Sequence, residues 1–332
     1  MIARTRYFVI TSLLVLVVGL GTGLLAYYVA RPGGLAGSDG PPELQYVPRD
    51  AAVVAYADVR EIMTSDVRQR IRRAIALPVP EDGQRQFQER TGIDIESDID
   101  RVVASLQPRP EGKTAGLVLA RGRFSDVKIE ALMREHGAEV SDYNGTRVIE
   151  HRAGSGVPAQ AGDSVALAFL EPGLVAVGSG PMVRAAIDLG RSGENVTANG
   201  ELMDLMRSLD SGNAWAIGRL DALTASGQLP AQLTTRLPAI TWFSVSGRVD
   251  SEVRGVVRVE TRDDQAASDL RDVVRGFLAL GKLQAGSRPE LQTMIQSLEL
   301  GGTGKTVALS FSIPAAVFDM IGARTGDGTK PQ

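Results

Sequence analysis

The feature that most constrains this chain is a stretch near its N-terminus, residues 7–30, that contains no charged residue. As an α-helix, these 24 residues would extend about 36 Å. About 20 mostly apolar residues are enough to span the hydrocarbon core of a bilayer. The sequence therefore predicts a single N-terminal transmembrane helix, with the lipid bilayer as the partner of residues 7–30.

The charges beside this stretch predict its orientation. Arg4 and Arg6 precede it, whereas Arg31 is the one basic residue that closely follows it. Because basic residues concentrate on the cytoplasmic side of membrane spans, we expect a single-pass protein with a cytoplasmic N-terminus and an extracytoplasmic C-terminal domain. A cleaved signal peptide is the alternative, with residues 34–36 as its best cleavage site, but its apolar region would normally hold only about 7–15 residues.

Gly19 and Gly23 lie four residues apart inside the predicted span. This GxxxG spacing lets two helices approach closely and would support weak self-association. Glycine is also common in membrane spans that do not pair, which is the favoured interpretation.

Composition excludes several classes of function. Charged residues make up 23% of the chain and the formal net charge is -3, so no nucleic-acid partner is expected. Aromatic residues make up only 5%, which leaves little material for stacking on bases or sugars. The absence of cysteine excludes disulfides, thiolate catalysis and cysteine metal sites. We expect no cofactor and assign no catalytic, cofactor-binding or metal-binding residue.

Segments rich in proline and glycine predict a division of the chain into an anchor, a linker, two folded units and a disordered tail. The two central segments together are long for a single core, which favours two units. In chain order, the predicted segments are residues 1–30, 31–45, 46–192, 193–322 and 323–332.

A faint internal repeat gives the predicted fold class. Three strand-like segments of the first half of the chain have counterparts in the second half, in the same order. Both segments of the second pair are followed by a helical pattern. We therefore predict an α+β protein in which the transmembrane helix precedes two tandem, duplicated units of antiparallel sheet covered by helices. The paired segments are 53–59 with 214–220, 115–120 with 254–259, and 165–169 with 307–311.

Asn144-Gly145 provides the clearest turn signal, because this dipeptide favours a two-residue hairpin between short strands. A helical stripe follows Ser125, an expected N-cap, and stops at Gly137. Antiparallel strands with covering helices are expected around both signals.

Gly304-Lys305-Thr306 resembles part of a phosphate-binding loop. That loop needs an earlier glycine where this chain has Glu299, and a helix after the lysine. An alternating strand pattern follows instead, so a hairpin turn is favoured.

Ser125 and Lys128 have the S-x-x-K spacing of serine acyl-enzymes. The chain lacks the accompanying S-D-N element, and Val307 stands where K-T-G needs glycine. Helix capping by Ser125 is the favoured explanation.

Four carboxylates, those of Asp94, Glu96, Asp98 and Asp100, could gather a calcium ion. The glycine and the final glutamate of an EF-hand loop are missing, so an acidic loop or a helix cap is favoured.

His136 and His151 are the only histidines, and their spacing implies no metal site. His136 is expected to lie on an apolar helical stripe near the helix C-terminus, where packing explains it.

Residues 46–56, 91–94 and 98–100 resemble segments of certain bacterial single-pass membrane-anchored proteins of unknown function. The resemblance covers the first unit and implies only a membrane location and an architecture, with no functional residue to carry over.

These observations predict a binding or scaffolding role, with a possible protein partner in the cell envelope. Two alternatives remain open: a membrane-tethered hydrolase that uses Ser or Asp/Glu, and a carrier of an apolar ligand between the two units.

Overall fold

The computed structural model describes residues 40–74, 88, 92, 94–109, 114–135, 137–151, 165–220, 240–285, 289–315 and 317. These residues divide into two compact units. Unit 1 comprises the described residues within Asp39–Arg60 and Pro78–Asp204, and unit 2 comprises those within Glu61–Leu77 and Leu205–Gln332. Each unit is built on antiparallel strands.

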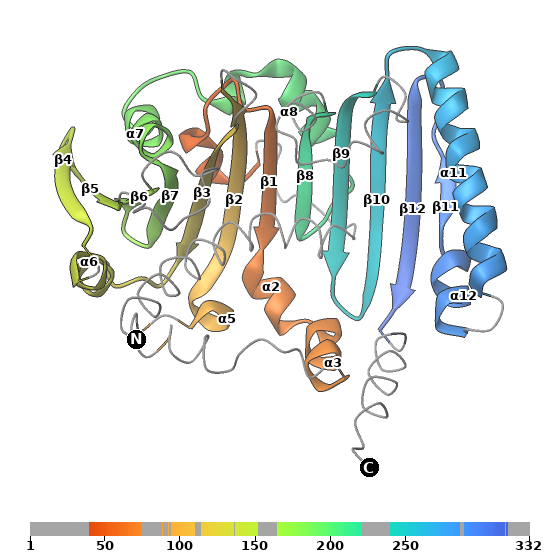
Figure 1. Ribbon diagram of the computed structural model, residues 1–332, viewed down its shortest axis with the longest axis horizontal. Helices are drawn as coiled ribbons and strands as arrows, with labels where there is room; N and C mark the ends of the chain where they lie inside the picture. Colours follow the sequence, from red (N-terminus) through yellow and green to blue (C-terminus); the bar gives the residue numbers. More distant parts are fainter. Residues whose placement is uncertain are drawn as a thin grey trace. The chain divides into compact units, whose positions relative to one another are not determined.

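Unit 1 contributes strands in the order β1-β2-β3-β7-β6-β5-β4, in which every neighbouring pair is antiparallel. After the meander β1 to β3, helix α6 (Asp126–Glu135) leads to β4 at the far end of this order. The chain then winds back through β5 and β6 until β7 pairs with β3 (Figure 1). The strands are β1 (Val53–Asp58), β2 (Ile99–Pro108), β3 (Thr114–Gly122), β4 (Glu139–Tyr143), β5 (Thr146–His151), β6 (Val165–Glu171) and β7 (Leu174–Ser179).

Unit 2 contributes strands in the order β11-β12-β10-β9-β8. Helices α11 (Asp264–Gln284) and α12 (Pro289–Gln296) follow the meander β8 to β10 and lead to the short strand β11. The last strand, β12, then inserts between β11 and β10. These strands are β8 (Ala214–Arg219), β9 (Ile240–Val249), β10 (Glu252–Thr261), β11 (Glu299–Gly301) and β12 (Thr306–Pro314).

Short helices complete both units. They are η1 (Pro42–Tyr46), α2 (Val59–Thr64), α3 (Asp66–Ala74), α5 (Ile95–Asp98), α7 (Gly180–Leu189), η4 (Val196–Ala198) and α8 (Gly200–Arg207).

Helix α6 packs on the sheet of unit 1 through one face. Ile129 and Met133, four residues apart and therefore on the same side of the helix, are buried against Ile149, Leu167 and Val175. The strand residues come from three neighbouring strands, so this cluster fixes the helix over β5, β6 and β7.

Helix α11 begins with a side-chain cap in unit 2. Asp263 accepts a hydrogen bond from the amide of Ala266 at 2.8 Å, which satisfies one of the free amides at the helix start. The first turns then bury Ala267 and Leu270 against Val307 of β12.

The predicted hairpin between β4 and β5 is confirmed. Asn144 and Gly145 have φ values of 52° and 73°, the left-handed backbone that a tight two-residue turn of the I′ type requires.

The predicted fold class is wrong. The described residues form mainly antiparallel sheet, with twelve strands. Among these residues, α11 is the only helix longer than ten residues. Sequence patterns of short apolar runs exaggerate the helical share, because a buried strand and a short buried helix share such runs.

The predicted duplication fails at its third pair. Residues 165–169 lie in β6, which is separated from β3 by β7, whereas residues 307–311 lie in β12, which pairs directly with β10. The two segments therefore occupy different places in their sheets, and their likeness reflects the shared preference of Val, Ala, Leu and Phe for buried strands.

The predicted anchor with Gly19 and Gly23, residue His136 and the tail at 323–332 lie outside the described residues. Within the described part of the chain, no helix is both long and apolar enough to cross a membrane. Residues 42–45, expected in the linker, belong to η1, in which Glu43 and Leu44 are buried.

Candidate functional site

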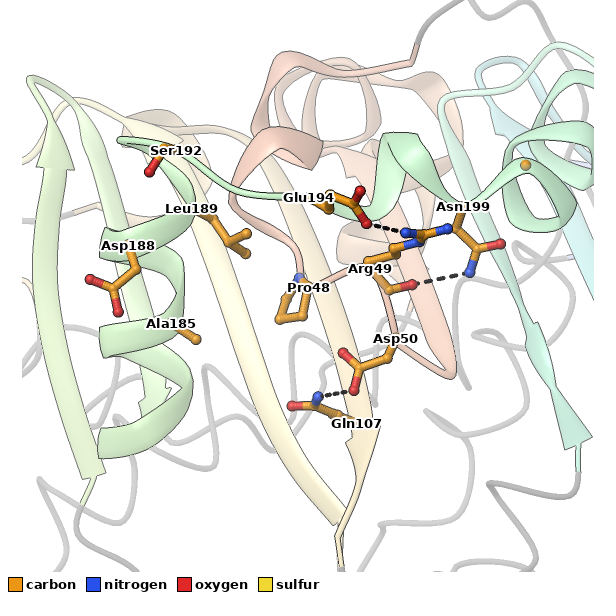
Figure 2. A pocket seen from close by; sticks show the side chains of 11 residues that line it. Pro48, Arg49, Asp50, Gln107, Ala185, Asp188, Leu189, Ser192, Glu194 and Asn199 are labelled. Atoms are coloured by element: carbon orange, nitrogen blue, oxygen red, sulfur yellow. Dashed lines mark hydrogen bonds and ion pairs between the residues drawn. The ribbon is translucent and has the colours of Figure 1, made fainter.

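A cleft of about 710 Å³ opens on unit 1. One wall consists of residues 48–50 with Gln107, and the other consists of the end of α7 and the segment that follows it (Figure 2). Its lining contains Pro48, Arg49, Asp50, Gln107, Ala185, Asp188, Leu189, Ser192, Glu194, Asn199 and Gly200.

Backbone contacts hold residues 195–199 against the first wall. The amide of Val196 donates to the carbonyl of Val47 at 2.9 Å, and Pro48 and Asn195 form an isolated antiparallel bridge. Asn199 Nδ2 donates to the carbonyl of Arg49 at 3.0 Å. Segments nearly 150 residues apart in the chain are thereby joined at this edge of the cleft.

Helix α7 presents its polar end to the cleft because its apolar side is already used. Met182, Val183 and Ala186 are buried in unit 1. Ala185 and Asp188, on the other side of the helix, line the cleft.

The cleft carries more negative than positive charge. Arg49 forms an ion pair with Glu194, and Gln107 Nε2 donates to Asp50 Oδ2 at 2.5 Å (Figure 2). Asp188 is the third lining carboxylate. One guanidinium against three carboxylates leaves a surface that favours cationic groups or hydrogen-bond donors.

Asp188 is held by the β4–β5 hairpin. It accepts a hydrogen bond from Tyr143 Oη at 2.9 Å and one from Asn144 Nδ2 at 2.8 Å. The hydrogen bond to Asp188 is the main cause that raises the pKa of the Tyr143 hydroxyl. The hairpin turn thus positions a carboxylate of the cleft.

A buried network of charges anchors η1, immediately before the first wall. Glu43, which is 1% exposed, accepts from Arg121 Nε at 2.5 Å and lies 3.1 Å from Arg101 Nε. Arg121 also donates to Glu171 at 2.7 Å, and Tyr46 Oη donates to the other oxygen of Glu171 at 2.5 Å. Strands β2, β3 and β6 therefore all hold η1.

The network has opposite effects on two of its members. The hydrogen bonds from Tyr46 and then from Arg121 lower the pKa of Glu171. Burial, followed by the hydrogen bond to Glu171, raises the pKa of Tyr46. Glu171 is therefore stabilised as a carboxylate and Tyr46 as a neutral phenol, which keeps this link intact around neutral pH.

Tyr46 also connects the network to α7. A Cβ atom at Gly190 would lie 2.5 Å from Cε1 of the Tyr46 ring. Only glycine lets the end of α7 approach the ring this closely, so Tyr46 contacts both the charge network and the end of α7.

The structure places Ser125 at the start of α6, where Oγ accepts from the amide of Lys128 at 3.4 Å. This is the predicted cap, although the bond is long. Lys128 is exposed, and neither residue lines the cleft.

The acidic segment 94–100 is divided among different partners. Asp98 accepts from the amide of Asp94 at 2.8 Å and pairs with Arg123 at 3.1 Å. Asp100 forms an ion pair with Arg60. Across the residues with assigned positions, no group of three or more His, Cys, Asp or Glu side chains could hold a metal ion.

Lys305 is exposed in the turn that precedes β12. Gly304, with a φ of 55°, makes this turn, and the strand after it rules out the helix that a phosphate-binding loop requires. His151 ends β5 and is not among the residues that line the cleft.

Sequence reasoning missed the cleft because its two walls carry no motif and are distant in the chain. The available signal was the density of polar residues between 188 and 199, which is ordinary for a surface loop. The residues that join this segment to 47–49 are recognisable only once the fold is known.

Comparison with known proteins assigns the chain to no family. No family model matches the chain, and no curated protein matches it significantly. The crystal structure of TP0453 in crystal form I aligns with a TM-score of 0.44 and 11% sequence identity, covering 86% of this chain and 99% of that one. A likeness this distant carries no argument.

Proposed function

We propose that this chain is a single-pass, membrane-anchored protein whose extracytoplasmic part binds a partner of the cell envelope. The proposal for the membrane rests on the charge-free residues 7–30 and on the basic residues that precede them. The proposal for binding rests on the cleft of unit 1.

The observation that supports binding is that a cleft with excess negative charge stands on a base of buried and half-buried ion pairs. Its lining offers three carboxylates and one guanidinium, while the charges that support it, on Glu43, Arg121 and Glu171, are buried or half-buried. Preorganised acceptors of this kind suit recognition, because little side-chain freedom is lost on binding. The matching ligand is a cationic segment, such as a lysine- or arginine-containing peptide.

The location is tested with a reporter enzyme fused after Gln332. Reporter activity outside the cytoplasm is expected, and activity inside would overturn the orientation. The chain should also stay with membranes in high salt, because burial of an apolar helix is not screened by ions.

Binding at the cleft is tested by thermal unfolding with short lysine peptides and with matched peptides that carry norleucine in place of lysine. A ligand that binds only the folded state stabilises it by about 2.7 kcal/mol at 100 times its Kd. We expect the lysine peptides to raise Tm and the norleucine peptides to leave it unchanged.

The double variant Asp50→Asn/Glu194→Gln should lose this response, since it removes two carboxylates of the lining. The matched control is Glu135→Gln/Glu139→Gln, which removes two exposed carboxylates of unit 1 outside the cleft. Equal responses of the two double variants would reject the cleft as the binding site.

A further inference from the structure

The guanidinium of Arg49 occupies one of the carboxylates that line the cleft of unit 1. It forms an ion pair with Glu194, which belongs to the opposite wall (Figure 2). The described partners of the other two lining carboxylates, Asp50 and Asp188, are neutral side chains. Glu194 is therefore the lining carboxylate whose charge is met by a cation of the chain itself.

The backbone on both sides of this ion pair is held by other contacts. Pro48 and Asn195, the neighbours of the two charged residues, form an antiparallel bridge. The carbonyl of Arg49 accepts a hydrogen bond from Asn199 Nδ2 at 3.0 Å. By contrast, the charged side chains of Arg49 and Glu194 are 53% and 70% exposed. Rotation of the Arg49 side chain can therefore open the ion pair while the two walls stay joined.

An ion pair this exposed is weak, because water competes for both charges. While it is closed, it neutralises Glu194 and places a positive charge in a cleft that otherwise attracts cations. A cationic ligand that needs Glu194 binds only the fraction of molecules in which this carboxylate is open, and its apparent affinity is reduced by that fraction. For an exposed ion pair the reduction is about three- to fivefold.

We propose that Arg49 is a built-in competitor of the ligand. Its guanidinium takes the place at Glu194 that a lysine or arginine side chain of the bound peptide occupies, and binding of the peptide displaces it. This inference rests on the function proposed for the cleft, and it assigns Glu194 as the residue that receives the cation of the ligand. The ion pair itself supports the assignment, since it shows that a cation on a long flexible side chain fits at this carboxylate.

A purely structural role of the ion pair predicts the opposite result when Arg49 is removed. If Arg49 only tied the walls together, its loss would loosen the cleft and weaken binding, because more freedom would be lost when the ligand binds. If Arg49 competes with the ligand, its loss strengthens binding. The sign of the change in Kd therefore decides between the two roles.

The test measures Kd by fluorescence anisotropy, with a labelled short lysine peptide titrated with the full chain at constant ionic strength. Arg49→Gln should lower Kd about three- to fivefold. Arg49→Lys, which retains a cation, should bind like the unsubstituted chain. The matched control is Arg147→Gln, which also removes an exposed guanidinium of unit 1 from an ion pair, but outside the cleft lining; its Kd should be unchanged. Circular dichroism checks that the variants are folded.

The outcomes separate this inference from the proposed function. If the unsubstituted chain prefers the lysine peptide to its norleucine counterpart, an unchanged or raised Kd in Arg49→Gln would overturn the competitor and leave binding at the cleft intact. An equal gain in Arg147→Gln would also overturn it, because the effect would then follow from net charge alone. If neither the unsubstituted chain nor Arg49→Gln distinguishes the two peptides, the proposed function fails and this inference fails with it.

Discussion

Helices α6 and α11 occupy similar places along their units but use their apolar residues differently. Each follows a three-stranded meander and leads the chain to the strand at the far end of its sheet order. Helix α6 has ten residues and buries Ile129 and Met133, whereas α11 has 21 and leaves four large apolar side chains exposed. Both helices bury one face against their sheets, and among the described residues only α11 carries a group of exposed large apolar side chains.

The units differ as well in how they use charge. In unit 1, Glu43 is 1% exposed and depends on Arg121. In unit 2, Arg258 and Asp210 pair at 2.5 Å with 30% and 42% of their side chains exposed. Water can replace the second contact but not the first, so the two pairs should differ in energy even though their distances are alike.

The largest effect is expected from Arg121→Ala. Removal of this guanidinium leaves Glu43 buried without its closest partner, and breaking a buried pair costs about 3–5 kcal/mol. Arg258→Ala should cost about 1 kcal/mol or less, since its pair is part-exposed. The described tryptophans, Trp215 and Trp242, both lie in unit 2, so their fluorescence does not report on unit 1. Circular dichroism and hydrogen exchange of the unit 1 strands should measure the loss of stability instead.

Equal destabilisation by Arg121→Ala and Arg258→Ala would contradict the distinction between the two networks. Arg121→Met is the informative second variant, because it keeps much of the side-chain volume and isolates the loss of charge.

The next effect concerns the packing of α6. Met133→Ala should destabilise unit 1 by about 3 kcal/mol, because it opens a cavity beneath a helix that rests on few side chains. Chemical denaturation followed by circular dichroism measures this change. The neighbouring Val127→Ala is the control and should be nearly neutral, since Val127 is 73% exposed.

Local features of the fold were predictable from the sequence, and their arrangement was not. The Asn144-Gly145 hairpin and the Ser125 cap follow from short-range backbone chemistry, and the structure has both. β6 and β12 occupy different places because β7 pairs with β3 in unit 1, whereas β12 itself pairs with β10 in unit 2. Which strand pairs there depends on contacts between residues far apart in the chain. Periodicity assigns strands but carries no information on their order.

The cleft could not be predicted from the sequence for the same reason. Its support depends on Glu43 meeting Arg121 and Tyr46 meeting Glu171, contacts between residues 78 and 125 positions apart. In the sequence, Glu43 is one acidic residue within a stretch rich in proline and glycine. Its burial is what gives it a structural role, and burial of a charge is visible only in the fold.

A third effect is a pH dependence of the stability of unit 1. The pKa of Glu171 is lower in the folded state than its usual value of 4.5, because Tyr46 and Arg121 hydrogen-bond to the carboxylate. Its stabilisation is therefore complete above the unfolded-state pKa and is lost as pH falls through the folded-state pKa. Urea denaturation between about pH 6 and pH 3 should show unit 1 weakening in acid.

Glu171→Gln should flatten that dependence, while Glu135→Gln, at an exposed position, should leave it unchanged. An identical slope in Glu171→Gln and the unsubstituted protein would show that other carboxylates control the acid response.

The smallest effect on folding is expected from Leu280→Ala, and it gives the comparison between the helices its sharpest form. Leu280 is 56% exposed on α11, so truncation leaves no cavity and removes little buried surface. Its cost should stay within about 0.5 kcal/mol, against about 3 kcal/mol for Met133→Ala in α6. The tryptophans of unit 2 provide the signal for this measurement. A loss of 2 kcal/mol or more on this scale would mean that the exposed side of α11 is packed within the folded chain. A neutral result would show that the stability of unit 2 does not depend on the exposed face of α11.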